Sequence, residues 1–171
     1  MPANTISILD VTKSQYKAFS CGYEELDNYL KRFAKGNHKS KFLGSTYVLL
    51  DEEEPVVIGY YTVCMAVLGF EEIPEDLRAG LPHYPLPAAR LCRLAVDTKH
   101  KGKGLGGYLL SDALWRVWQA SKSLAACAVV VDAKDEIAKS FYLHYDFIPC
   151  EDKDLSLFLP MDTITKIFEE K

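Results

Sequence analysis

A basic, glycine-rich turn is the part of this sequence whose residue types are best suited to chemistry. Residues 91–107 read LCRLAVDTKHKGKGLGG, an apolar run followed by lysines that alternate with glycines. Glycines lack a Cβ, so their N–H groups can converge on an anion, and a helix start adds about half a positive charge. The turn predicts a site for a phosphorylated cofactor. Its expected binding residues are Lys101, Gly102, Lys103, Gly104, Leu105, Gly106 and Gly107.

Two kinds of phosphate-binding loop fit this glycine spacing. Residues 102–107 match G-x-G-x-x-G, a dinucleotide-binding pattern, with Asp132 about 25 residues on as a ribose-binding acid. A dinucleotide turn needs its first glycine close to the strand end, whereas residues 97–101 intervene here. The other reading is basic-x-x-G-x-G, with Lys101, Gly104 and Gly106 in the key positions.

The spacing of apolar residues predicts the elements that position this turn. Strands are expected near residues 7–11, 46–50, 56–68, 90–96, 126–131 and 155–159. Helices are expected near residues 21–35, 104–121 and 135–144, with a short amphipathic tail over 162–171. Residues 71–89 contain four prolines, which predicts an irregular excursion. The fold class is therefore α/β, of the α+β kind, in a single domain over residues 1–171.

Length and composition are those of an ordinary globular protein. Of the 171 residues, 49% are hydrophobic and 26% are charged, and no run reaches the roughly 18 apolar residues of a membrane span. The start, Met1 to Thr5, lacks the features of a signal peptide. We therefore expect a cytoplasmic protein with no membrane partner. The five cysteines and four histidines are scattered without ligand spacing, so no metal is expected.

Positive charge is concentrated in one segment. The net charge is −4, yet residues 31–50 contain five cations and no acid. The five cations are Lys31, Arg32, Lys35, Lys39 and Lys41. Such a segment is either a solvated helix surface and loop or a face that binds a phosphate backbone, and composition leaves both readings open.

The glycine turn, followed within 40 residues by a strand, a turn and Phe141-Tyr142, resembles the GNAT acetyltransferases. Over roughly residues 19–160 the chain is similar to the GNAT toxins of toxin/antitoxin pairs. The motifs that carry this similarity are FSCG at 19–22, TYV at 46–48, GYY at 59–61, RLAVD at 93–97 and AKD at 133–135.

Three positions depart from the pattern of this family. Lys101 stands where the family usually has Arg or Gln, and Cys92 where the toxins often have Gly. Residues 145–147 read Tyr-Asp-Phe where the family usually has Tyr/Phe-Gly-Phe. Asp146 must therefore adopt the left-handed conformation, which Asp tolerates better than most residues.

The resemblance implies a fold, a cofactor and a reaction. The fold is a mixed, mostly antiparallel sheet flanked by helices on both faces. The turn would hold the pyrophosphate of acetyl-CoA, and the backbone of Leu94, Ala95 and Val96 would pair with its pantetheine. GNAT toxins acetylate the α-amino group of aminoacyl-tRNA and pair with small ribbon-helix-helix antitoxins. The implied partners are a charged tRNA, an antitoxin and, by analogy, a second copy of the chain.

Acetyl transfer to an amine needs an acid for the departing thiolate, and Tyr142 is our candidate. The alternative is a core aromatic, because Phe141 and Phe147 flank it. No motif supplies a general base, although a glutamate from Glu71 to Glu75 could fold over the site. The missing base favours an α-amine as acceptor: with a pKa near 7.7 it is about 15 to 20% neutral at pH 7, far more than a lysine. For an RNA acceptor, the expected binding residues are Arg93 and the five cations of residues 31–41.

The sequence thus predicts an acetyl-CoA-dependent N-acetyltransferase that modifies aminoacyl-tRNA and so inhibits translation. A second hypothesis is a housekeeping enzyme that acetylates a small-molecule amine or a protein N-terminus, which the acidic remainder of the chain favours. A third is a non-catalytic acetyl-CoA-binding module, against which Lys101, Gly104, Gly106 and Tyr142 argue.

Overall fold

The computed structural model describes residues 5–170. The first four residues of the opening segment, from which we predict the absence of a signal peptide, lie outside the described residues. No helix in this part of the chain combines the length and the apolar character that crossing a membrane requires.

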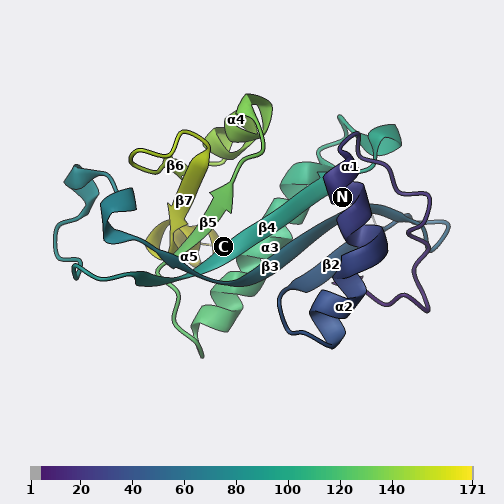
Figure 1. Cartoon of the computed structure of the whole chain (residues 1–171), viewed down its shortest axis with the longest axis horizontal. Helices are drawn as coiled ribbons and strands as arrows, with labels where there is room; N and C mark the ends of the chain where they lie inside the picture. The colour runs from purple at the N-terminus through teal and green to yellow at the C-terminus, as the bar shows by residue number, and fades with distance from the viewer. Residues whose placement is uncertain (1–4, 171) are drawn as a thin grey trace. The chain divides into compact units, whose positions relative to one another are not determined.

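Strands and helices alternate along the chain as the sequence predicts, with some additions (Figure 1). The strands are β1 (Ile6–Ile8), β2 (Ser45–Leu50), β3 (Val57–Leu68), β4 (Leu86–Val96), β5 (Ala128–Asp132), β6 (Ile148–Pro149) and β7 (Ser156–Pro160). The helices are α1 (Glu24–Asn28), α2 (Ala34–Lys39), α3 (Leu105–Ser121), α4 (Glu136–His144) and α5 (Met161–Glu169). A π-helical turn, η1 (Tyr29–Phe33), joins α1 to α2, and short 3-10 turns are η2 (Phe70–Glu72), η3 (Glu75–Leu77) and η4 (Thr98–His100).

The chain divides into two compact units. The first unit comprises Met1–Cys64 and Cys92–Ala113, and the second comprises Met65–Leu91 and Leu114–Lys171. Strands β3 and β4 and helix α3 contribute residues to both. The seven strands form a mixed, mostly antiparallel sheet, which confirms the predicted fold class.

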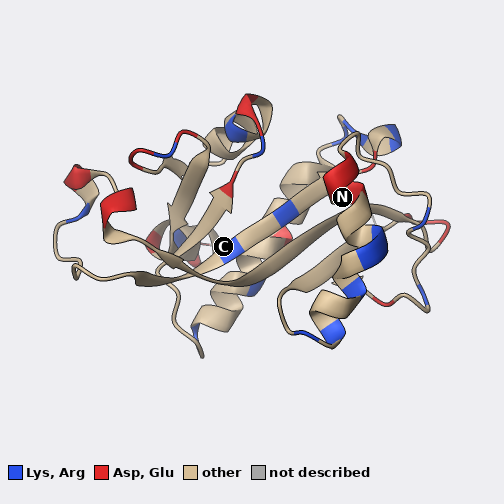
Figure 2. Ribbon diagram, viewed as in Figure 1, with Lys and Arg blue, Asp and Glu red and all other residues tan. Residues whose placement is uncertain are grey.

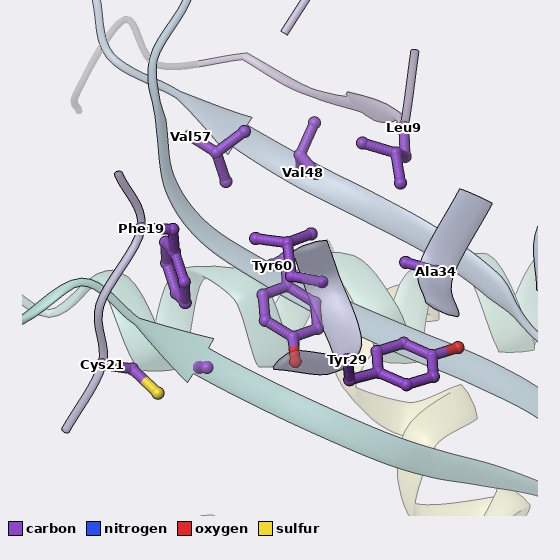
Figure 3. Packing of buried hydrophobic residues seen from close by; sticks show 10 residues of the cluster. Leu9, Phe19, Cys21, Tyr29, Ala34, Val48, Val57 and Tyr60 are labelled. Carbon is purple, nitrogen blue, oxygen red and sulfur yellow. The ribbon is translucent and has the colours of Figure 1, made fainter. Parts of the chain in front are cut away.

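The first unit has helical segments on both faces of its strands. Strand β2 pairs antiparallel with β1 and with β3, as the predicted hairpin requires. Tyr60 points into a core that includes Tyr29 and Phe19 (Figure 3), and its hydroxyl donates to the carbonyl of Leu26 at 2.7 Å. Its neighbour Tyr61 donates to Asp112 of α3 at 2.5 Å. Because successive strand residues point to opposite faces, the α1–α2 segment and α3 cover opposite sides.

The second unit is built on β5. This strand pairs in parallel with β4, from Ala89 opposite Val129 to Leu91 opposite Val131, and antiparallel with β7, which also pairs with β6. Its core is apolar and includes Leu68, Leu86, Ala128, Val130 and Phe158. Arg90 and Asp132 form an ion pair beside this core. The V-V-V run of β5 is buried, as expected of a strand that is covered on both faces.

Two sequence predictions need correction, and one strand, β6, lies outside every predicted element. The irregular excursion over residues 71–89 ends earlier, because β4 begins at Leu86 and Pro87 is part of it. Pro87 lacks an N–H, but its carbonyl accepts from the N–H of Cys127 at 2.8 Å, so it still joins the strand. The helix over residues 21–35 is interrupted by η1. Strand β6 has two residues, too few to give a periodic pattern.

Candidate active site

The glycine-rich turn is anchored at its start by the buried carboxylate of Asp97. This carboxylate accepts the N–H groups of Lys99 at 3.0 Å and of Ser20 at 3.1 Å. In return, the N–H of Thr98 donates to the carbonyl of Ser20 at 2.8 Å. The turn is therefore held against the FSCG segment at residues 19–22, which explains why these distant motifs occur together.

Two glycines give the turn its shape. Gly102 and Gly104 have φ values of 79° and 77°, in the left-handed region that favours glycine. A Cβ built on either meets no atom within 4 Å, so backbone conformation and open space, not crowding, characterise both positions. Helix α3 starts directly afterwards, with the N–H of Tyr108 bonded to the carbonyl of Gly104 at 3.1 Å.

The start of α3 offers the N–H groups that an anion needs. Leu105, Gly106 and Gly107 occupy its first turn, where N–H groups have no acceptor within the helix. The side chain of Leu105 is buried, so this residue offers its backbone. The exposed Lys103 lies in the same turn. Open space, backbone donors and positive charge together fit the pyrophosphate of a coenzyme.

Lys101 has a contact that the sequence does not reveal. Its ammonium donates to the carbonyl of Cys21 at 2.7 Å and lies 5.7 Å from the centre of the Tyr23 ring. The lysine therefore joins the turn to the FSCG segment, in addition to any role toward phosphate.

The end of β4 extends beyond its register with β5. The parallel pairs cover Ala89–Leu91, whereas Leu94, Ala95 and Val96 continue toward the turn. Ala95 is buried in the core of the first unit. These three residues therefore lie beyond the stretch of β4 that pairs with β5.

The basic segment of residues 31–41 shares the first unit with the turn. All five of its cations are exposed, which suits either solvent or a phosphate backbone. Figure 2 shows their positions as blue stretches of ribbon around α2. Arg93 is half-buried, and its guanidinium carbon lies 3.6 Å from the centre of the Tyr29 ring. Tyr29 begins η1, the turn that carries Lys31 and Arg32. The structure thus places Arg93 against the segment that carries the predicted RNA-binding cations.

Tyr142 lies in the second unit, on α4. The carboxylate of Asp135 caps this helix by accepting the N–H of Ala138 at 2.8 Å. The Tyr142 ring is buried, with ring centres 5.2 Å from Phe141 and 5.3 Å from Phe147. Burial raises the pKa of the Tyr142 phenol above its usual value of 10, so the hydroxyl keeps its proton.

The turn that follows α4 has the conformation that the sequence requires. Asp146 has a φ of 66°, which confirms the left-handed conformation predicted for the Tyr-Asp-Phe departure. The N–H of Phe147 then donates to the carbonyl of Tyr142 at 3.2 Å. This turn brings the Phe147 ring back onto Tyr142.

Comparison with known proteins decides the family. A family model described as an acetyltransferase (GNAT) domain matches residues 67–163, more than half of the chain. The matched range contains both the glycine-rich turn and Tyr142. The chain belongs to the GNAT acetyltransferase family. It is therefore an acetyltransferase with acetyl-CoA as its donor, and the dinucleotide reading of the turn is wrong.

Relatives of this acetyltransferase include toxins. A tRNA-acetylating toxin of Mycobacterium tuberculosis is 35% identical over 144 residues, with 84% of each chain covered. A structure of a tyrosine-to-phenylalanine variant of KacT has a TM-score of 0.90 at 30% identity, covering 96% of this chain and 99% of that one.

Two further structures show what a relative of this acetyltransferase binds. AtaT in complex with acetyl-methionyl-tRNAfMet has a TM-score of 0.88 at 30% identity, covering 96% and 99% of the two chains. A tyrosine-to-phenylalanine variant of AtaT, bound to the C-terminus of the antitoxin AtaR and to acetyl-CoA, has a TM-score of 0.83 at 30% identity, covering 97% and 98%.

Sequence reasoning missed the residues that hold the turn in place. Asp97 and Ser20 carry no motif chemistry of their own, and 77 residues separate them. The two motifs that contain them, FSCG and RLAVD, were the available signal. Among residues 5–170 no three His, Cys, Asp or Glu side chains are grouped as a metal site requires, and the absence of a metal stays a prediction.

Proposed function

We propose that this acetyltransferase transfers the acetyl group of acetyl-CoA to the α-amino group of aminoacyl-tRNA and so inhibits translation. The observation that carries the proposal is the first unit, which holds an anion-binding turn and an exposed segment of five cations. The named relatives support it, because one is a tRNA-acetylating toxin and another is bound to an acetylated aminoacyl-tRNA.

The cofactor half of the proposed site is the turn and the end of β4. The N–H groups of Gly102, Gly104, Gly106 and Gly107 would bind the pyrophosphate, with Lys101 and Lys103 adding positive charge. Acetyl-CoA supplies an acetyl group activated as a thioester. The backbone of Leu94 or Val96 would donate a hydrogen bond to the oxyanion that develops during transfer.

Tyr142 is the proposed catalytic acid. Its buried phenol holds a proton at neutral pH and would give it to the thiolate that leaves. The raised pKa keeps the phenol protonated at neutral pH but also makes it a weaker acid, so transfer of its proton must depend on close positioning of the hydroxyl against the thiolate. The acceptor α-amine needs little help from a base, because a useful fraction is already neutral near pH 7.

The acceptor half of the proposed site includes Arg93 and the basic segment. Lys31, Arg32, Lys35, Lys39 and Lys41 are exposed and would contact phosphates of the tRNA. Each phosphate contact releases counterions, so binding should weaken steeply as salt rises.

The decisive experiment is incubation with acetyl-CoA and bulk charged tRNA, followed by a search for N-acetyl-aminoacyl-tRNA. We expect product on at least one isoacceptor, and none on uncharged tRNA. A lack of product across all isoacceptors would overturn the proposed acceptor.

A salt series identifies the role of the basic segment. Replacing Lys31, Lys35 and Lys39 with Gln should lower the slope of log rate against log salt by about 2, since each lost contact removes about 0.7 to 0.9. Lys13→Gln with Lys17→Gln, two exposed lysines outside the segment, is the matched control. A rate that does not depend on salt would favour a small-molecule amine as the acceptor.

We also propose the context in which the enzyme works. AtaT is bound by an antitoxin, which supports an antitoxin as a partner here. That this antitoxin is of the ribbon-helix-helix type rests on the resemblance to the GNAT toxins alone. A homodimer, a cytoplasmic location alongside charged tRNA, and a single domain over residues 1–171 complete the proposal. The single domain is supported by the family match, which includes residues of both compact units.

A further inference from the structure

Two cysteines of the first unit lie close enough to react with each other. Cys64 is in β3 and Cys92 is in β4, and their sulfur atoms are 2.9 Å apart. A disulfide bond is about 2.0 Å long, so the sulfurs need to approach by about 0.9 Å to form one. All five cysteines are thiols in this structure.

The other cysteines are less accessible or carry a raised pKa, and Cys64 and Cys92 lie side by side. Both are half-buried, so a small oxidant can reach them, whereas Cys21 is 2% exposed. Burial raises the pKa of Cys127, and burial raises that of Cys150 to about 11. A thiol whose pKa is raised holds less of the reactive thiolate at neutral pH.

We propose that Cys64 and Cys92 form an oxidation site for peroxides, which links them in a reversible disulfide. Hydrogen peroxide oxidises one thiolate to a sulfenic acid, and the peroxide O–O bond breaks to give water after protonation. The second thiol then attacks the sulfenic sulfur, forming the S–S bond and releasing a second water. Dithiol and peroxide thus become disulfide and two waters, and a thiol reductant reverses the step.

The position of the pair gives the disulfide a consequence for the enzyme. Cys92 precedes Arg93 and lies two residues before Leu94, the start of the strand segment proposed to align pantetheine. Drawing the sulfurs together shifts this segment by a fraction of an ångström, and small misplacements at a reacting centre are costly. This second step rests on the proposed function, whereas formation of the disulfide does not.

The first experiment measures the bond itself. Reduced protein is treated with hydrogen peroxide, digested without reductant and examined by mass spectrometry. We expect a Cys64–Cys92 crosslinked peptide that dithiothreitol removes, in the natural sequence and in the Cys127→Ser control. In Cys64→Ser or Cys92→Ser, the remaining thiol should instead give a sulfenic acid that dimedone traps. The proposal would be overturned if Cys64 and Cys92 could still be alkylated after peroxide treatment, or if either formed a crosslink to another cysteine.

The second experiment measures the consequence. Acetyl-CoA binding is titrated before and after oxidation, and we expect oxidation to weaken it about tenfold. Cys92→Ser should bind acetyl-CoA equally with and without peroxide. Equal binding by the two forms of the natural sequence would overturn the link to the cofactor. Failure of the reduced protein to bind acetyl-CoA would instead contradict the proposed function, and the crosslink result would still decide the oxidation site.

Discussion

The glycine-rich turn and the surroundings of Tyr142 are built in opposite ways. The turn is exposed, and it is fixed by backbone conformation, by the N–H groups that donate to Asp97 and by the ammonium of Lys101, which donates to the carbonyl of Cys21. Tyr142 is buried, and its ring packs against the rings of Phe141 and Phe147. One region is open and rich in polar backbone groups, and the other surrounds a phenol ring with aromatic side chains.

The difference shows how each region could fail. A turn made of backbone geometry is sensitive to a single added methyl group where φ is positive. A phenol among apolar rings keeps its packing when its hydroxyl is removed, so its chemistry can be separated from its structural role.

The largest effect on kcat is expected from Tyr142→Phe, which removes the hydroxyl and keeps the packed ring. Tyr142→Phe should lower kcat about 100-fold, because the acid is lost while the ring stays in place, and acetyl-CoA binding should change little. Tyr145→Phe, on the same stretch of chain and 5.1 Å from the Phe141 ring, is the matched control. Equal kcat in the natural sequence and Tyr142→Phe would leave Tyr142 as a core aromatic.

The turn is tested by one methyl group. Gly104→Ala should weaken acetyl-CoA binding about tenfold, because a left-handed alanine costs about 1 to 2 kcal/mol and the turn would relax away from φ 77°. Gly36→Ala is the control, since Gly36 lies in α2 with nothing within 4 Å of its Cβ. The control should bind acetyl-CoA normally and gain some stability. Isothermal titration measures both, and equal affinities would show that the turn does not depend on this conformation.

The anchor of the turn is tested through stability. Asp97→Asn keeps one acceptor oxygen where the carboxylate has two, so one of two part-buried N–H groups loses its partner. The free energy of unfolding should therefore fall by about 1 kcal/mol. Asp135→Asn should change it little, because Asn caps helices as well as Asp does. Urea denaturation measures both. Equal losses in the two variants would contradict the role given to Asp97.

The smallest effect concerns pH. Because burial raises the pKa of Tyr142 above 10, its phenol should stay protonated over the working pH range. The value of kcat/KM should therefore rise as the acceptor amine loses its proton, up to about pH 8, and then stay level to about pH 10.

The same raised pKa predicts how the stability of the fold depends on pH. A phenol with a raised pKa stabilises the fold below pH 10, and this contribution is lost as pH rises further. The midpoint of thermal unfolding should therefore fall more steeply above pH 10 in the natural sequence than in Tyr142→Phe.

Much of the fold is predictable from local patterns. The hairpin of β2 and β3, helix α3 and helix α4 lie close to the predicted positions, because their apolar spacing and the Asp135 cap are local signals. The start of β4 was not predictable, because Pro87 joins the strand through a hydrogen bond from Cys127, 40 residues away. The π-helical turn η1 has the same apolar spacing as an α-helix, so periodicity cannot distinguish it from the α-helices on either side.

In the candidate site, too, local features can be predicted from the sequence and long-range contacts cannot. The turn, Tyr142 and the basic segment can be found in the sequence, because glycines, lysines and a family motif mark them. The contacts of Arg93 with Tyr29 and of Lys101 with Cys21 cannot, because they join residues that are far apart in the chain.

The sequence by itself determined the glycine-rich turn, the left-handed Asp146 and the acetyltransferase family, because each depends on residue types at fixed local spacing. Only the tertiary structure decided which groups hold that turn, how deeply Tyr142 is buried and which cysteines meet. The reason is physical. Burial and long-range hydrogen bonds depend on which residues, far apart in the sequence, become neighbours in the folded chain. The same folding raises the pKa of Tyr142 by burying it and brings the sulfurs of Cys64 and Cys92 to 2.9 Å.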